Sequence, residues 1–449
     1  MSVICYAKRR RLMRVLSFLM AVMLLITSFA TAMAQEEETM MYTDPKVLPQ
    51  LEGMPELLRF LDGTEVKTPE DWQRRREEIL GLYQYYIYGY LPDKTTETVS
   101  YTLSPLADAS GYDMTVTVSA GEKTASFTVT VTLPKTEAPA GGYPYFVEYI
   151  WAWPGFPAVS QNQQYAASRG YAGIAYNPIP VAADNNTFTG AYYTLHPYYT
   201  KDPTDKTGVL LAWAWGVSKI IDAMEMGAGA EMNINPALSL VGGVSRYGKS
   251  VAVAGAYDER IKVCIPSCSG GGGLAPFRTS NHGKTYDLTS LGGAAAWTNT
   301  SINEPLSNLK GGEGYWFTWN FRYLASPEVI PVEQYMLSAL TAHPDRHMII
   351  VTGITSEGWN NTEGQCFSFL ASQPVWDLLG CPDQNNMIIH LDGHAILPSD
   401  MVYILDYCDV HLFGKDPADV KSDLSQMKGN LFLEHNRDVL GDEFAPYMQ

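Results

Sequence analysis

Positive charge is scarce in this sequence. Its 449 residues include 31 lysines and arginines against 48 aspartates and glutamates. Five of the cations lie in the first 34 residues, so the rest of the chain has 26 basic and 48 acidic residues, a formal charge of about −22. Nucleic acids and anionic membranes repel such a chain. Neither is therefore expected as a partner.

Cysteine is also scarce. The sequence has six, of which Cys5 lies in the N-terminal segment. No pair among the others has the spacing of a zinc site, so we expect no structural metal. Their number is odd, so at least one stays unpaired, and the sequence assigns no bridge. These five are Cys264, Cys268, Cys366, Cys381 and Cys408.

Long apolar runs are absent beyond the N-terminus. Five cations precede the run Val15–Ala30, and Ala32-Met33-Ala34 follows with the small residues of a cleavage site. Residues 1–34 are therefore predicted to be a signal peptide, and the protein to be secreted or periplasmic. An uncleaved anchor is the alternative. No later stretch approaches about 18 apolar residues, so no membrane contact is expected after cleavage.

The chain after residue 34 shows a lead-in followed by one long domain. Residues 35–66 are polar and contain several prolines, which predicts an extended lead-in. Thr68 and Pro69 then have the residue types of a helix N-cap and first turn, so we expect a helix towards Tyr88. We interpret residues 67–449 as a single catalytic domain, because no linker or internal repeat interrupts them.

The pattern of short apolar runs predicts an α/β fold. The first three runs alternate in the manner of antiparallel hairpins, and the later ones alternate with helical stretches such as 208–226. This order is typical of an α/β-hydrolase: a three-layer sandwich whose central sheet is mainly parallel, with an antiparallel N-terminal portion. The predicted strands are 98–104, 111–118, 124–133, 145–150, 172–176, 238–242, 261–265, 347–352 and 386–390.

Segment 237–256 joins an apolar strand, a glycine-flanked turn and a helix of small residues. Its turn contains Gly243, Ser245 and Gly248, a Gly-x-Ser-x-Gly nucleophile elbow with one extra residue. Small neighbours are needed because bulky ones would clash with the strand or the helix. The helix start offers N–H groups to a developing oxyanion. We predict that Ser245 is a nucleophile; a structural turn is the alternative.

A serine nucleophile needs a histidine base and an acid that orients it. In this fold both lie on loops after late strands, in the order serine, acid, histidine. His394 follows the strand 386–390, whereas His390 falls inside it and is better explained as a packed or hydrogen-bonded core residue. Glu357 follows the preceding strand and is the predicted acid, with Glu363 as the alternative.

The chain resembles the glucuronoyl esterases, carbohydrate esterase family 15, over roughly residues 68–413. That family carries Gly-Cys-Ser-Arg-x-Gly-Lys at its elbow, and here Val244 replaces the cysteine. The matching elbow residues are Ser245, Arg246, Gly248 and Lys249. Further matching segments are 72–78, 212–216, 331–337, 357–364, 374–380 and 393–394.

The resemblance implies a serine esterase that works without metal or cofactor. Its substrate would be the ester between (4-O-methyl-)glucuronate of glucuronoxylan and lignin alcohols, cleaved through an acyl-enzyme. Ser245 would attack, His394 would act as base, and Arg246 would stabilise the oxyanion. The residues that would bind the glucuronate are Lys249, Trp359 and Glu313. The alternatives are a solvent-facing charge pair for the two cations and core packing for the tryptophan.

One position departs from the family pattern. Many members place the acid in a Pro-Gln-Glu-Ser-Gly-like turn, and here Cys268 stands where that glutamate would be. A thiol orients an imidazolium poorly unless its pKa is unusually low. Some bacterial members carry the acid after the later strand, where Glu357 stands. We therefore interpret the sequence as an active enzyme with a relocated acid; an inactive relative is the alternative.

Two other functions compete with this interpretation. One is the hydrolysis of another carbohydrate ester, acetyl or methyl, because fold and triad do not define the acyl group. The other is a non-catalytic carbohydrate-binding protein, which the 28 tyrosines and 10 tryptophans would also suit. We expect a monomer whose partner is the ester substrate.

Overall fold

The computed structural model describes residues 42–151, 155–198, 206–441, 444 and 446. The chain divides into two compact units, residues 1–48 and 49–449, and every element below belongs to the second. The predicted signal peptide lies outside the described residues. Within them, no helix has both the length and the apolar character needed to cross a membrane.

A nine-stranded mixed sheet forms the centre of the second unit, in the order β1-β2-β3-β5-β4-β6-β7-β10-β11. Its first three pairings are antiparallel and the other five are parallel, which confirms the predicted α/β-hydrolase class. The strands are β1 (Glu97–Pro105), β2 (Gly111–Ala120), β3 (Lys123–Thr132), β4 (Tyr143–Tyr149), β5 (Ala172–Tyr176), β6 (Ile234–Val244), β7 (Val263–Ser267), β10 (His347–Gly353) and β11 (Asn385–His390).

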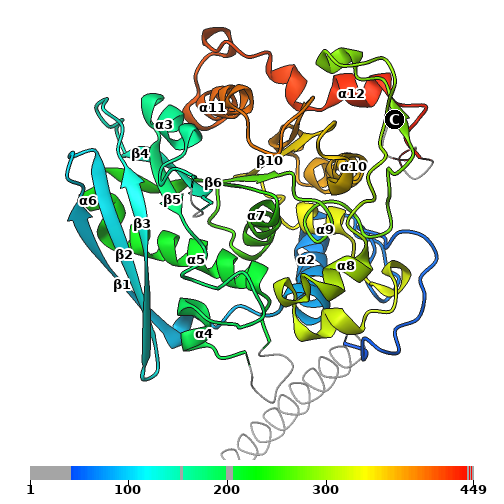
Figure 1. Cartoon of the computed structure of the whole chain (residues 1–449), viewed down its shortest axis with the longest axis horizontal. Helices are drawn as coiled ribbons and strands as arrows, with labels where there is room; N and C mark the ends of the chain where they lie inside the picture. Colours follow the sequence, from blue (N-terminus) through cyan, green and yellow to red (C-terminus); the bar gives the residue numbers. More distant parts are fainter. Residues whose placement is uncertain (1–41, 152–154, 199–205, 442–443, 445, 447–449) are drawn as a thin grey trace, which may run out of the picture. The chain divides into compact units, whose positions relative to one another are not determined.

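Helices cover both faces of the parallel strands (Figure 1). On one face, α3 (Gln161–Ser168) and α11 (Pro398–Phe413) pack over a core of aliphatic side chains that includes Leu240, Ile349 and Met401. On the other face lie α5 (Val209–Ala223), α7 (Arg246–Tyr257), α9 (Gln334–Ala339) and α10 (Thr362–Leu378). Because both faces are covered, β4, β5, β7 and β10 are buried at every position.

The antiparallel strands differ in that one of their faces is solvated. Burial alternates along β2 and β3, as expected when helices cover only one side. On the solvated face, hydroxyl groups pair across the strands: Thr115 with Thr128 at 2.9 Å, and Thr117 with Ser126 at 2.8 Å. Such pairs support the hairpin but bring no reactive groups together.

Helix α2 (Pro69–Tyr83) begins as the sequence predicts. Thr68 is its N-cap and forms a reciprocal capping box with Asp71, with Pro69 in the first turn. A π-helical turn, Gln84–Tyr88, continues it to the predicted end. Before α2, the only regular pairing in residues 49–66 is the isolated bridge between Arg59 and Glu65.

The remaining elements are short and lie mainly in the connections. They include α4 (Ala191–Leu195), α6 (Gly229–Glu231), α8 (Leu306–Gly311), α12 (Asn430–His435), β8 (Thr285–Tyr286) and β9 (Trp297–Thr298). Strands β6, β7, β10 and β11 run parallel, so the residues that follow them meet at one edge of the sheet. That edge receives Ser245, Cys268, Glu357 and His394.

Candidate active site

Ser245 occupies a strained turn between β6 and α7. Its φ of 63° and ψ of −129° are rare for a residue with a side chain. A side chain at Gly248 would overlap the Ser267 carbonyl, and this explains the glycine there. The Ser245 N–H donates to that same carbonyl at 2.9 Å, which holds the turn against β7. This geometry is that of a nucleophile elbow.

Helix α7 starts directly after the serine. The Lys249 N–H donates to the Ser245 carbonyl at 2.9 Å, so the N–H groups of Arg246 and Tyr247 precede the first intrahelical bond. These groups and the positive end of the helix dipole lie beside Ser245. They can stabilise negative charge that develops on a substrate oxygen.

An ion pair with Asp184 holds the Arg246 side chain. The guanidinium donates to Asp184 Oδ2 at 2.6 Å and lies 5.2 Å from the ring centre of Trp316. The other carboxylate oxygen of Asp184 accepts from Tyr315 Oη at 3.1 Å and from Trp316 Nε1 at 2.9 Å. Asp184 was not predicted from the sequence. It lies in the loop after β5, 62 residues before Arg246, and no motif surrounds it.

His394 and Glu357 form the closest histidine–carboxylate pair at this edge. His394 Nδ1 lies 2.7 Å from Glu357 Oε2, where Nδ1–H donates to the carboxylate and leaves Nε2 as an acceptor. Glu357 is 1% exposed and the His394 ring 35%. The Asn360 amide also donates to Glu357 Oε2. This arrangement suits a general base whose ring is oriented by a buried acid.

The alternative base, His390, and the alternative acid, Glu363, both make hydrogen bonds to other residues. Both ring nitrogens of His390 are occupied, Nδ1 by Asp400 and Nε2 by the Gly393 carbonyl, each at 2.9 Å. Glu363 accepts from Lys284 at 2.5 Å and from the Tyr286 hydroxyl. His390 is thus the hydrogen-bonded strand residue that the sequence predicts, and Glu363 belongs to another ion pair.

Ser245 and the His394 loop contact a common residue. Ser267 accepts from the Ser245 N–H, and its own hydroxyl donates to the Ala395 carbonyl at 3.3 Å. The Ser245 side chain makes no capping hydrogen bond to α7. Hydrogen bonds between nucleophile and base commonly tighten only when substrate binds.

Cys268 lies beside the histidine–carboxylate pair. Its backbone has a φ of 46° and its N–H donates to the Val351 carbonyl at 2.8 Å. Burial, with the charge of Glu357, raises the pKa of the Cys268 thiol to about 12. The thiol therefore cannot act as an anionic orienting group. Its sulfur lies within 4.8 Å of ligand atoms of Glu357 and His394, a set that could hold a metal ion.

Lys249 is buried next to the elbow, and all three of its donors are used. Its ammonium donates at 2.7 Å to each of the Ser269 carbonyl, the Gly271 carbonyl and Glu304 Oε2. Burial lowers the pKa of Lys249, and the charge of Glu304 opposes that effect. A substrate hydroxyl could bind Lys249 only by displacing one of these acceptors.

Glu304 connects this lysine to the histidine. Its N–H donates to the Trp359 carbonyl at 3.1 Å, and the Trp359 ring centre lies 5.4 Å from that of His394. The sequence did not predict Glu304, because it stands in a long loop without a motif. The predicted Glu313 is half-buried before a short 3₁₀ helix, Gly314–Trp316, and contributes a weaker charge interaction to Lys249.

Gly270 leaves space for three polar side chains, those of Glu304, Asn360 and Lys249. It has a φ of +57°, and a side chain there would overlap Glu304 Oε2 and Asn360 Oδ1 and crowd the Lys249 ammonium. The glycine-rich turn after β7 thus lets these three polar groups face one point. That point lies beside the Glu357–His394 pair, because Asn360 also donates to Glu357.

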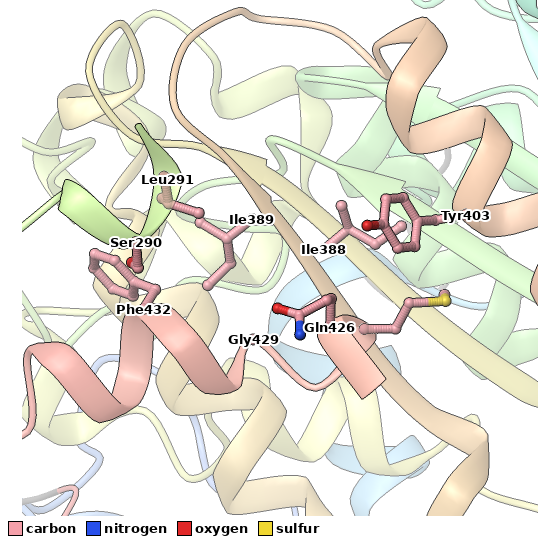
Figure 2. A pocket seen from close by; sticks show the side chains of 9 residues that line it. Ser290, Leu291, Ile388, Ile389, Tyr403, Gln426, Gly429 and Phe432 are labelled. Carbon is pink, nitrogen blue, oxygen red and sulfur yellow. The ribbon is translucent and has the colours of Figure 1, made fainter. Parts of the chain in front are cut away.

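A hollow of about 200 Å³ lies beside β11, against Ile388 and Ile389 (Figure 2). Apolar side chains form most of its wall, with Ser290, Tyr403 and Gln426 as polar members. No carboxylate, cation or histidine lines it, so it lacks acid–base groups. Its lining residues are Ser290, Leu291, Ile388, Ile389, Tyr403, Gln426, Met427, Gly429 and Phe432.

Comparisons with known proteins agree on one family. Residues 116–380 match the family model described as glucuronyl esterase, fungi. The chain is 39% identical over 417 residues to a multidomain esterase of Ruminococcus flavefaciens, which covers 90% of this chain but only 52% of that protein. It is 30% identical over 353 residues to the 4-O-methyl-glucuronoyl methylesterase of Schizophyllum commune, covering 76% of this chain and 77% of that one.

A solved structure gives the same result. It is the carbohydrate esterase family 15 glucuronoyl esterase of Caldicellulosiruptor kristjansonii, with a TM-score of 0.72 and 37% identity. The similarity covers 84% of this chain and 95% of that one. The similarity to this structure thus extends beyond residues 116–380, the segment that the family model matches.

Proposed function

The chain belongs to the glucuronoyl esterases, carbohydrate esterase family 15, and we propose that it hydrolyses esters of (4-O-methyl-)glucuronate in glucuronoxylan, those of lignin alcohols included. Membership makes it a carboxylic-ester hydrolase. The arrangement of charged groups around Gly270 is the main support for this proposal. The Lys249–Glu304 pair and Asn360 meet at Gly270, and Asn360 also donates to Glu357, the carboxylate that pairs with His394.

Ser245 is the proposed nucleophile and His394 its base. His394 Nε2 takes the hydroxyl proton while Ser245 Oγ bonds to the ester carbonyl carbon. Glu357 accepts from Nδ1 at 2.7 Å and stabilises the imidazolium that forms. Asn360 keeps the carboxylate in place. The proposed acid thus lies in the loop after β10. The turn after β7, where many family members have their acid, holds Cys268 instead.

Arg246 is proposed to stabilise the oxyanion. Its guanidinium carries a fixed charge, and Asp184 with the Trp316 ring limits where that charge can lie. The N–H groups at the start of α7 add preorganised donors. The tetrahedral intermediate then collapses: the C–O bond to the alcohol breaks and His394 returns its proton to the alkoxide. Water attacks the resulting acyl-enzyme by the same steps, which frees the glucuronate and Ser245.

The sugar is proposed to bind beside Lys249. Glu304 offers a carboxylate oxygen to glucuronate hydroxyls, and Lys249 keeps it in place and supplies charge. The half-buried Trp359 next to His394 offers a flat face for the ring. Glu313 is proposed as an additional, outer contact. This assigns the hydroxyl contacts first to Glu304, since all three donors of Lys249 are already used.

Export is part of the proposal. The sequence pattern of residues 1–34 supports a cleaved signal peptide and a secreted or periplasmic enzyme that meets plant cell-wall material. Residues 67–449 are proposed to form the catalytic domain, after a lead-in of residues 35–66. We propose that the enzyme acts as a monomer without metal or cofactor.

The test compares two substrates. Wild type should hydrolyse benzyl glucuronate, and Ser245→Ala should lower kcat by about 10⁴-fold or more. Activity on acetylated xylan alone would replace this proposal with an acetyl esterase. Absence of turnover, together with failure of a fluorophosphonate to label Ser245, would instead indicate a carbohydrate-binding protein without chemistry.

A further inference from the structure

Three potential metal ligands meet next to the proposed nucleophile. The Cys268 sulfur, a Glu357 carboxylate oxygen and a His394 ring nitrogen all lie within 4.8 Å of one another. Each follows a different strand of the sheet: β7, β10 and β11. Thiolate, imidazole and carboxylate together are the ligand types that zinc prefers, in tetrahedral sites with one position left open.

A second observation also indicates a ligand at this place. Glu357 is 1% exposed, yet its Oε1 has no hydrogen-bond partner among the described residues. The other oxygen is occupied by His394 and Asn360. A buried carboxylate oxygen without a donor is costly in free energy, and a cation would satisfy it.

We propose that Cys268, Glu357 and His394 form a zinc site, and that zinc bound there inhibits the esterase because it occupies the proposed base, His394. The proposal rests on the proposed function for its inhibitory part, but not for metal binding itself. Cys268, which the mechanism does not use, thereby gains a role in regulation by a thiophilic divalent cation.

The chemistry of binding balances with one proton released. Zn²⁺ bonds to the Cys268 sulfur, which loses its proton to solvent, and to the carboxylate and imidazole without further proton loss. The bound site then carries two ligand charges against two metal charges. Because the cysteine must be deprotonated to bind, zinc binding is coupled to the release of this one proton.

Inhibition follows from the nitrogen that the metal takes. His394 Nδ1 is the ring atom that faces Glu357, at 2.7 Å. A neutral imidazole that binds zinc through Nδ1 carries its proton on Nε2. Nε2 then cannot accept the Ser245 proton. The exposed side of the ring, 35% open, provides the access path for the ion.

The test measures zinc binding and activity separately on the full chain. After treatment with EDTA and desalting, Zn²⁺ is titrated into wild type, Cys268→Ser, Cys268→Ala and Cys381→Ser by calorimetry. Cys381 is the matched control, since it is also a free buried cysteine but lies outside the cluster. Ser245→Ala is included because it removes the nucleophile and leaves all three ligands.

One Zn²⁺ should bind per chain in wild type, Cys381→Ser and Ser245→Ala, with at least about tenfold weaker binding in both Cys268 variants. Zn²⁺ should inhibit wild type and Cys381→Ser reversibly by EDTA, and each Cys268 variant at least about tenfold less, relative to its own zinc-free rate. Equal binding in the Cys268 variants, or none in wild type, would overturn the proposal. Thermal melts confirm that each variant folds. Zinc binding by an inactive Ser245→Ala protein separates failure of this site from failure of the proposed function.

Discussion

Two histidine–carboxylate pairs lie four residues apart at the end of β11, and they differ in what remains free. His390 gives Nδ1 to Asp400 and Nε2 to the Gly393 carbonyl, and it is 8% exposed. His394 gives only Nδ1 to a carboxylate, that of Glu357, and its ring is 35% exposed. The first pair has no ring nitrogen left as an acceptor, whereas the second keeps Nε2, which could accept the Ser245 proton.

This difference shows that proximity to a carboxylate does not by itself make a base. A carbonyl and a carboxylate both accept, so this pairing favours a proton on each ring nitrogen, the positively charged form of His390. It fastens Gly393, the residue before His394, to the strand. Asp400 also accepts from the Leu397 N–H at 2.8 Å, which closes the loop from the other side. The His390–Asp400 pair therefore helps to hold the loop in which His394 lies.

The largest expected effect separates the two histidines by activity. His394→Gln should lower kcat/KM for a glucuronate ester by about 10⁴-fold, because the base is lost. His390→Gln should lower it far less, by about tenfold, since only the position of the loop changes. Steady-state kinetics of both variants on one substrate provides the check. Equal losses would mean that the distinction between the pairs is wrong.

The reverse order is expected for stability. His390→Gln leaves the buried Asp400 with fewer donors, so the free energy of unfolding should fall by about 2 kcal/mol. His394→Gln, at a more exposed position, should change it by less than about 1 kcal/mol. Urea titration measures both. A larger loss at His394 would contradict the account.

The charge of His390 also predicts a pH dependence of stability. Burial alone would lower its pKa, but the hydrogen bond and charge of Asp400 outweigh burial, so the pKa is raised above 6.5. Its contribution is fully present below the unfolded value of 6.5 and is lost as pH rises through the folded pKa. Relative to His390→Gln, wild type should therefore lose stability as the pH rises above 6.5. Parallel curves for the two proteins would refute the charged state.

The smallest effect is expected at Asp392, a third carboxylate, which lies in the loop that holds His394. Asp392 is exposed and accepts from the Thr355 hydroxyl at 3.0 Å. Asp392→Asn should change kcat/KM less than about twofold and stability by less than about 0.5 kcal/mol. It is the matched control for Glu357, because both acids lie near His394 but only one is buried. A large loss of activity in Asp392→Asn would mean that Glu357 has been wrongly assigned as the acid.

The strands, and the residues that lie at their carboxyl ends, could be predicted from the sequence. Every predicted strand is present, because buried parallel strands are apolar throughout and solvated hairpins alternate. Ser245, Glu357 and His394 could be placed because each lies at or shortly after the end of a strand. His390 could be separated from His394 because it lies inside β11 and not after it.

The residues that the sequence did not reveal lie in long loops. Asp184, Glu304 and Asn360 reach the site through turns whose paths depend on contacts distant in sequence. The commitment of all three Lys249 donors was hidden for the same reason, since two of its acceptors are backbone carbonyls of the turn after β7. Loop geometry of this kind has no local signature.

The most direct test of the central claim is the rate of benzyl glucuronate hydrolysis by Glu357→Ala. If Glu357 is the acid that orients His394, kcat/KM should fall by about 100-fold or more while the protein remains folded. An unchanged rate in a folded Glu357→Ala protein would contradict the relocated acid, and with it the assignment of Glu357 and His394 as one catalytic pair.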